Sequence, residues 1–157
     1  MTREEKYMRE AIALSKKAIE NDEGGPFGCI VVKNDEIIGR GNNKVILDND
    51  PTAHAEIVAI RDACRHLGTF QLSGCEIYTS CEPCPMCLGA IYWARPEKIY
   101  YANTREDAAS VGFDDSMIYQ EINLDVGNRK IPSANLCRSD ALAIFDNWIS
   151  KGDKTLY

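Results

Sequence analysis

The most constraining feature of this chain is a set of potential metal ligands divided between two distant segments. His54 is followed two residues later by Glu56, and the second segment reads Pro83-Cys84-Pro85-Met86-Cys87. Cys84 and Cys87 lie three residues apart at the start of a predicted helix, so both side chains can face one point. The helix N-terminus also favours the thiolate form that binds a metal. Any fold that uses all three ligands on one ion must bring the two segments together.

These residue types favour a catalytic zinc site. A catalytic zinc takes three protein ligands and keeps one position for water, whereas a structural zinc is closed by four. His54, Cys84 and Cys87 would supply three. Two thiolates cancel the formal charge of the ion, so a neighbouring base must activate the water, and Glu56 is the candidate. Spacing alone does not bring Glu56 to the site, because residues two apart on an ideal helix do not face each other.

Two other interpretations of the cysteines are open. Cys81 could join His54, Cys84 and Cys87 in a closed structural zinc site, which would make the protein a non-enzymatic zinc module. That interpretation leaves Glu56 and the two prolines without a role, and we interpret Cys81 as a buried neighbour of the site. The spacing also resembles the beginning of an iron–sulfur run, but the fourth cysteine is absent.

Composition limits the class of protein and of partner. The 157 residues are 45% hydrophobic, enough for one domain with a core, and we expect a single domain over 1–157. The opening segment is charged and no apolar run could span a bilayer, which favours a cytoplasmic protein without a membrane partner. Seven cysteines, an odd number, favour a reduced compartment. A net charge of −6 makes a nucleic-acid partner unfavourable and favours a small neutral substrate.

Hydrophobic periodicity predicts alternating helices and strands. Thr2 and Glu5 form a capping-box pattern ahead of a first helix whose apolar face includes Ile12 and Ile19. Asn34-Asp35 separates two short apolar runs, as in a β-hairpin. Further strands are predicted over 76–80 and 98–102, and helices over about 53–67, 85–94, 116–121 and 139–152. The alternation predicts an α/β layered fold with a sheet in the middle.

Longer motifs carry a resemblance to a known family. They are Gly25-Pro26-Phe27-Gly28, Gly41-Asn42-Asn43, Asp50-Pro51-Thr52-Ala53-His54-Ala55-Glu56 and Tyr78-Thr79-Ser80-Cys81-Glu82-Pro83-Cys84-Pro85-Met86-Cys87. Together they resemble the cytidine and deoxycytidylate deaminase superfamily. The resemblance implies a three-layer α/β/α cytidine-deaminase-like fold with a central five-stranded mixed sheet. It also implies one Zn²⁺ per subunit and Glu56 as the catalytic residue, which moves protons from the attacking water to the departing ammonia.

The base that is deaminated has to be inferred from the rest of the chain, because those motifs are shared by enzymes acting on different bases. Residues 88–96, 112–116 and 154–157 are similar to the small bacterial guanine deaminases. This resemblance implies conversion of guanine to xanthine and ammonia, a reaction of purine metabolism. The alternatives keep the chemistry and change the base to cytosine, cytidine or a tRNA adenosine.

Several residues are candidates for substrate binding. Guanine has N–H groups along one edge, and a carboxylate can accept hydrogen bonds from them. We favour Asp115 for this role, with Asp114 as the competitor. Either aspartate could instead cap the helix that begins near residue 116. The resemblance implies that Asn43 bonds the base, although Asn43 could also be a turn residue. It further implies Ala55 as a contact.

Aromatic residues complete the predicted substrate site. Phe27 and Trp93 resemble residues that wall a flat purine, although an aromatic beside Ile91 and Tyr92 is often part of a core. In the family the C-terminal segment, about 139–157 here, closes the active site of the partner subunit. The resemblance therefore implies a homodimer, domain-swapped if the tail acts in trans, with Tyr157 as a substrate contact. The sequence leaves open whether the tail acts in cis or in trans.

Overall fold

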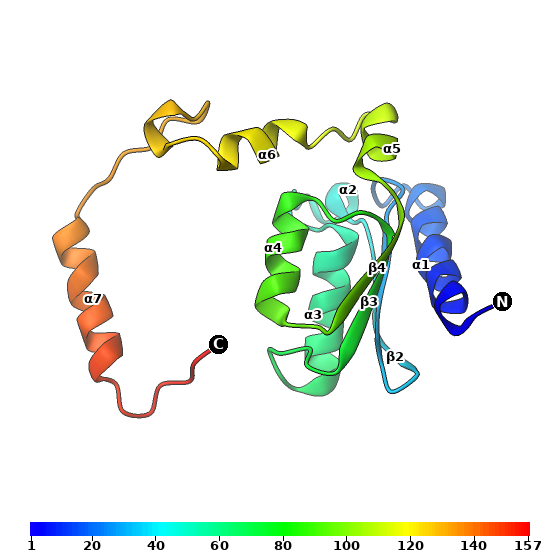
Figure 1. Ribbon diagram of the computed structural model, residues 1–157, viewed down its shortest axis with the longest axis horizontal. Coiled ribbons are helices and arrows are strands. Elements are labelled where there is room, and N and C mark those ends of the chain that lie inside the picture. Colours follow the sequence, from blue (N-terminus) through cyan, green and yellow to red (C-terminus); the bar gives the residue numbers. More distant parts are fainter. The chain divides into compact units, whose positions relative to one another are not determined.

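A mixed β-sheet forms the centre of residues 1–115 in the computed structural model, which describes all residues from 1 to 157 (Figure 1). Its four strands are β1 (Gly28–Lys33), β2 (Glu36–Asn42), β3 (Cys75–Cys81) and β4 (Lys98–Asn103), in the spatial order β2-β1-β3-β4. Strand β1 runs antiparallel to both of its neighbours, and β3 and β4 are parallel. The α/β fold and the mixed sheet are confirmed.

The expected fifth strand is wrong, because the chain turns into helices after β4. The Thr104 side chain accepts a hydrogen bond from the Asp107 backbone N–H, and the Asp107 carboxylate accepts one from the Thr104 backbone N–H. This reciprocal capping box ends the extended segment and starts a helix. The helices are α1 (Arg3–Glu20), α2 (Val45–Asp48), α3 (Ala55–Leu67), α4 (Pro85–Ala94), α5 (Arg105–Ser110), α6 (Ser116–Ile122) and α7 (Arg138–Ser150), with a 3₁₀ turn η1 (Val126–Asn128).

Helices cover both faces of the sheet, as the three-layer architecture requires (Figure 1). Successive side chains of a strand point to opposite faces. On β1, Cys29 and Val31 belong to a core shared with α3 and α4, whereas Ile30 and Val32 belong to a second core shared with α1. The sheet is therefore buried on both sides, with α3 and α4 together on one of them.

The hairpin and the first helix follow the sequence signals. Asn34 and Asp35 both have positive φ, 49° and 63°, which is the conformation that a tight two-residue hairpin turn needs. Thr2 caps α1 in the predicted capping box with Glu5. The buried face of α1 differs from the predicted one, because it consists mainly of Tyr7, Ala11 and Ala18, while Ile12 and Ile19 are exposed.

Helix α3 packs against β2 through small residues. Its buried apolar side chains are Ala55, Ala59 and Ala63. They face Gly41 and Gly39 on β2, where an added Cβ on Gly41 would lie 2.2 Å from the Ala55 carbonyl oxygen and 2.5 Å from the Ala59 nitrogen. The missing side chains let the helix backbone approach the strand closely. This approach fixes the height of the start of α3 over the sheet.

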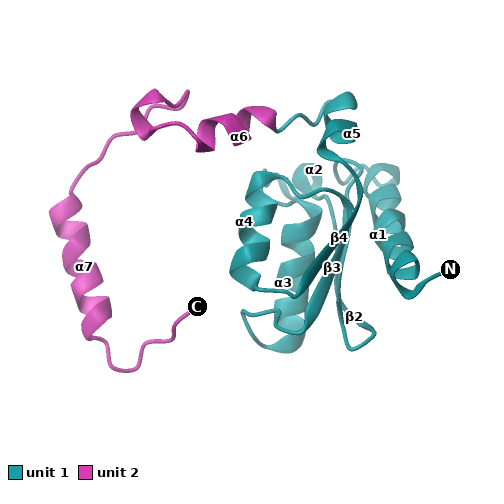
Figure 2. Ribbon diagram, viewed as in Figure 1, with its two compact units in different colours: residues 1–115 teal, residues 116–157 magenta.

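The last part of the chain forms a separate unit. Residues 1–115 make up unit 1 and residues 116–157 make up unit 2 (Figure 2). Unit 2 contains α6, η1 and α7, and none of its residues is buried. The single domain expected over 1–157 stays a prediction. No helix of the protein combines the length and the apolar character needed to cross a membrane.

A substitution at Gly41 tests the close approach of α3 to the sheet. We expect Gly41→Ala to lower the free energy of unfolding by about 2 kcal/mol or more, because its Cβ would collide with helix backbone that cannot move aside alone. The matched control is Gly89→Ala on α4, where a Cβ meets nothing within 4 Å and should stabilise the helix by about 0.5–1 kcal/mol. Urea unfolding of both variants measures the difference, and equal stabilities would contradict the packing argument.

Candidate active site

His54 lies immediately before α3 and is its N-cap residue. Its backbone is extended, with φ −69° and ψ 155°, and its carbonyl oxygen accepts the first helical hydrogen bond, from Val58, at 3.0 Å. Glu56 is the second residue of the helix proper. Because His54 is not helical, the rule that residues two apart diverge on a helix does not apply to this pair. The side chains of His54 and Glu56 are therefore free to converge over the end of α3.

Cys84 occupies the equivalent place on α4. It is the N-cap residue, with φ −66° and ψ 168°, and Pro85 follows as the first helical residue. Cys87 lies one turn further on, with its side chain buried. Two helix N-termini thus meet in one place, and each presents potential metal ligands there. Helix N-termini stabilise negative charge, which suits the thiolate form of both cysteines.

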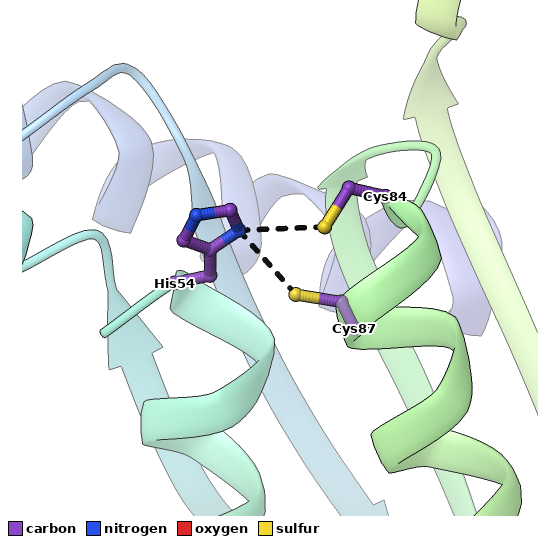
Figure 3. Close-up of side chains that lie close together, drawn as sticks. All are labelled: His54, Cys84 and Cys87. Carbon is purple, nitrogen blue, oxygen red and sulfur yellow. Dashed lines mark hydrogen bonds between the residues drawn. The ribbon is translucent and has the colours of Figure 1, made fainter. Parts of the chain in front are cut away.

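The three side chains point toward one another (Figure 3). The Nδ1 atom of His54 lies 3.5 Å from the sulfur of Cys84 and 3.5 Å from the sulfur of Cys87. All three ligand atoms lie within 4.8 Å of one another. A tetrahedral zinc with Zn–S of about 2.3 Å and Zn–N of about 2.0–2.1 Å separates nitrogen from sulfur by about 3.5 Å. The distances and the donor types therefore fit a zinc ion bound through Nδ1.

The electrostatics of the three ligands favour metal binding. Hydrogen bonds from the Cys87 thiol and from His54 lower the pKa of Cys84 to about 4, against the opposing effect of burial. The pKa of Cys87 is raised well above its usual range, first by its hydrogen bond to Cys84 and then by burial. Contact with Cys84 raises the pKa of His54. A divalent cation bound at this point would further favour the thiolate form of both cysteines.

Cys81 is held away from these ligands. It ends β3, and its thiol donates a hydrogen bond of 3.6 Å to the carbonyl oxygen of Thr104. Burial raises the pKa of Cys81 to about 11, which disfavours the thiolate that zinc would need. The cluster of ligand atoms contains His54, Cys84 and Cys87 without Cys81. The geometry therefore favours three protein ligands over a closed set of four.

Glu56 is a buried acid beside this ligand set. Only 6% of the residue is exposed, and burial is the main cause that raises the pKa of its carboxyl. The Thr79 hydroxyl donates a hydrogen bond of 3.1 Å to Oε1 of Glu56. The Cys87 thiol also lies within hydrogen-bonding reach of the carboxyl. A carboxyl with a raised pKa next to a metal site can accept a proton from one group and release it to another.

The position of Asn43 is compatible with both predicted roles, that of a turn residue and that of a substrate contact. It is buried where β2 ends, and its Oδ1 accepts hydrogen bonds from the backbone N–H of Gly25 at 3.3 Å and of Val45 at 3.1 Å. These bonds tie the loop before β1 to the start of α2, which is the structural role of a turn residue. Because Oδ1 already accepts twice, a bond from Asn43 to a substrate would be donated by Nδ2.

Phe27 packs against Phe113, a residue of the 112–116 segment for which the sequence predicted no individual role. Its ring meets that of Phe113 edge-on, with centroids 4.9 Å apart and planes at 87°. Phe113 directly precedes Asp114 and Asp115, so this contact anchors the two aspartates to the loop that carries Phe27. Its signal in the sequence is faint: one aromatic between a glycine and two acidic residues.

The two aspartates differ in their surroundings. Asp114 is exposed, whereas Asp115 is half-buried. Burial raises the pKa of Asp115, and the negative charge of Cys84 raises it further. Asp115 therefore interacts electrostatically with one of the metal-ligand residues. This difference favours Asp115 over Asp114 as the residue that faces a substrate bound beside the metal.

The remaining predicted contacts have separate outcomes. Ala55 is fully buried as the first helical residue of α3, where backbone N–H groups lack partners within the helix. Trp93 is 65% exposed, so it is not part of the core, and it lies about 13 Å along the axis of α4 from Cys84. Tyr157 belongs to unit 2 and is exposed. Substrate contact by all three stays a prediction.

Comparison with known proteins identifies the family. Residues 1–103 match the family described as the cytidine and deoxycytidylate deaminase zinc-binding region. The chain belongs to this deaminase family. Within it, a guanine deaminase from Bacillus subtilis is 48% identical over 153 residues, 98% of each chain. The crystal structure of a B. subtilis guanine deaminase superposes with a TM-score of 0.95, again over 98% of both chains at 48% identity.

The chain is also similar to proteins named as tRNA-specific adenosine deaminases. A tRNA-specific adenosine deaminase of B. subtilis is 46% identical, but over 101 residues, 64% of this chain and 62% of its own length. A tRNA-specific adenosine deaminase of Buchnera aphidicola covers 93% of both chains at 34% identity. Identity over the shared deaminase region thus does not separate the two substrates, whereas identity over the whole chain is higher with the guanine deaminase.

Removal of single cysteines tests the three-ligand set. We expect Cys84→Ala to weaken zinc binding by more than about 100-fold, because loss of even an outer-shell partner costs about 10–100-fold. Cys81→Ala should keep one zinc per chain, because the Cys81 thiol is bonded to Thr104 and not to the ligand set. Competition with a chelating dye measures both affinities. Equal loss in the two variants would indicate a closed four-ligand site.

Proposed function

We propose that this protein is a zinc-dependent aminohydrolase that converts guanine and water to xanthine and ammonia. The observation that carries the reaction type is the buried Glu56 carboxyl beside a three-residue ligand set that leaves one coordination position for water. The choice of guanine as the substrate is supported by the 48% identity to a guanine deaminase over nearly the whole chain. In this proposal His54, Cys84 and Cys87 hold the zinc.

The chemistry divides between the metal and Glu56. Zinc supplies a Lewis acid that makes a water molecule easier to deprotonate. Glu56 takes a proton from that water, and the resulting hydroxide adds to C2 of guanine while the C2–N3 π electrons move onto N3. The same carboxyl gives a proton to the C2 amino group, so that the C2–N bond breaks and ammonia leaves. Burial raises the pKa of Glu56, which helps the carboxyl to hold the proton between these steps.

Substrate recognition is proposed for residues around this site. Guanine has N–H groups that can donate hydrogen bonds to the half-buried carboxylate of Asp115. Leaving such donors unpaired in a closed pocket is costly. Asn43 would donate through Nδ2 to an acceptor of the base, since its oxygen is already engaged. The ring of Phe27, held by Phe113, offers a flat apolar surface. Together these groups fit a neutral purine.

The surface of unit 2 supports a homodimer. Helix α7 has no buried residue. Its exposed large apolar side chains are Leu142, Ile144, Phe145, Trp148 and Ile149. Burying one such side chain is worth about 1.5–3 kcal/mol, so a helix of this kind gains strongly from being covered. On unit 1, α4 and β4 expose Tyr92, Trp93 and Tyr101. We infer a second copy of this chain as the partner, with its tail at the neighbouring active site.

A glutamine at position 56 tests the reaction. We expect Glu56→Gln to retain one zinc per chain and to lower guanine turnover by about 100- to 10,000-fold, because general acid–base transfer contributes that much. Ammonia release is measured from guanine, guanosine, cytosine, cytidine, adenine and isolated tRNA. Turnover of another substrate without turnover of guanine would contradict the proposed base. Unchanged turnover by the glutamine variant would contradict the proposed acid–base role.

Mixing two inactive variants tests whether the tail acts in trans. One variant carries Glu56→Gln with an intact tail, and the other lacks Leu156 and Tyr157 but keeps Glu56. If the tail completes the partner's site, refolding the two together should restore turnover to about a quarter of the wild-type value, the share of sites that combine both intact parts. Each variant refolded alone is the control. Absence of restored turnover in a demonstrated heterodimer would place the tail in cis.

A further inference from the structure

We propose that Thr79 is a positioning residue that fixes the orientation of the Glu56 carboxyl. This inference rests on the deaminase activity proposed above. Thr79 lies in β3, is 1% exposed, and donates its hydroxyl to Oε1 of Glu56 at 3.1 Å. The bond joins the sheet to the first turn of α3. It ties one carboxyl oxygen to the strand and leaves the second oxygen for proton transfer.

The Thr79 hydroxyl is the donor that survives metal binding. Besides Thr79, the side chain within hydrogen-bonding reach of the Glu56 carboxyl is Cys87. Cys87 belongs to the proposed ligand set, and a cysteine binds zinc as a thiolate, which has no proton to donate. In the zinc-loaded protein the Thr79 hydroxyl therefore remains as the side-chain donor that orients Glu56.

The strand holds this hydroxyl firmly. Thr79 pairs with Cys29 across β1 and β3, and Cys29 belongs to the core beneath α3. Cross-strand partners point to the same face of a sheet, so Thr79 also faces α3. A β-branched side chain in a strand has restricted rotation about χ1. The hydroxyl is thus fixed by a rigid element, and the carboxyl it bonds inherits that fixed position.

The neighbouring Ser80 provides a matched control. It is also buried in β3, with 3% of the residue exposed, and its Oγ accepts a hydrogen bond of 3.0 Å from the backbone N–H of Gly28. As the next residue along the strand, it points to the opposite face from Thr79. Loss of either hydroxyl removes one buried hydrogen bond, but only Thr79 is bonded to Glu56.

The experiment compares Thr79→Val, Thr79→Ser and Ser80→Ala, each loaded with zinc. We expect Thr79→Val to keep one zinc per chain and a KM within about twofold of wild type, while kcat falls by about 10- to 100-fold, the range that misplacement of a reacting group can cost. Thr79→Ser keeps the hydroxyl and should restore kcat to within about threefold. Ser80→Ala should lower the thermal midpoint as Thr79→Val does and leave kcat unchanged.

Several results would overturn the inference. They are a wild-type kcat in Thr79→Val, a loss confined to KM, failure of Thr79→Ser to restore turnover, or an equal fall of kcat in Ser80→Ala. If the valine variant does not fold, Thr79→Ala takes its place, with calorimetry of xanthine binding to show that the pocket is intact. A wild-type protein that releases no ammonia from any of the tested bases would instead refute the proposed function.

Discussion

The N-terminal ends of α3 and α4 meet at His54, Cys84 and Cys87, and the positions of the other functional side chains follow from that meeting. Two thiolate ligands place two negative charges close together at a partly buried site, and these charges must be stabilised. Two helix N-termini supply a favourable field for that charge without adding formal positive charges. The same arrangement leaves the unpaired N–H groups of the first helical turns directed at the site, where they can serve polar substrate atoms.

The meeting depends in turn on how closely α3 lies on the sheet. Alanines on the helix face glycines on β2, so the helix backbone nearly touches the strand. Glu56 is carried to within reach of Thr79 by this packing, since the hydrogen bond spans from helix to strand. A larger residue at the interface would lift the helix and separate these groups. Catalytic geometry and core packing are thus set by the same contacts, and neither can be changed alone.

Much of this arrangement could be predicted from the sequence, because its signals are local. The capping box of Thr2 and the Asn34-Asp35 turn each act within a few residues, and each has the predicted effect. The ligand types and their spacing likewise indicated zinc. What spacing could not give was the convergence of His54 with Glu56, which depends on His54 lying outside the helix as its N-cap.

Other features were missed because they depend on contacts distant in sequence. The role of Thr79 arises from a residue on a separate helix, and the pairing of Phe27 with Phe113 joins the loop before β1 to the end of unit 1. The expected fifth strand came from the resemblance, and the local capping box at Thr104 and Asp107 argues against it in this chain. That local signal is present in the sequence, where Thr104 and Asp107 have the three-residue spacing of a capping box.

Unit 2 shows a different limit. Its helix α7 has an apolar stripe of the kind that normally marks a core-facing helix, and the periodicity that predicted the helix was correct. Yet no residue of unit 2 is buried, so this apolar surface is exposed. An apolar stripe on a helix indicates a surface suited to packing, but it does not indicate which molecule packs against it. If a second copy covers it, the active site and the dimer are specified by the same segment, and a substitution on α7 would affect substrate turnover through assembly and not through contact with the base.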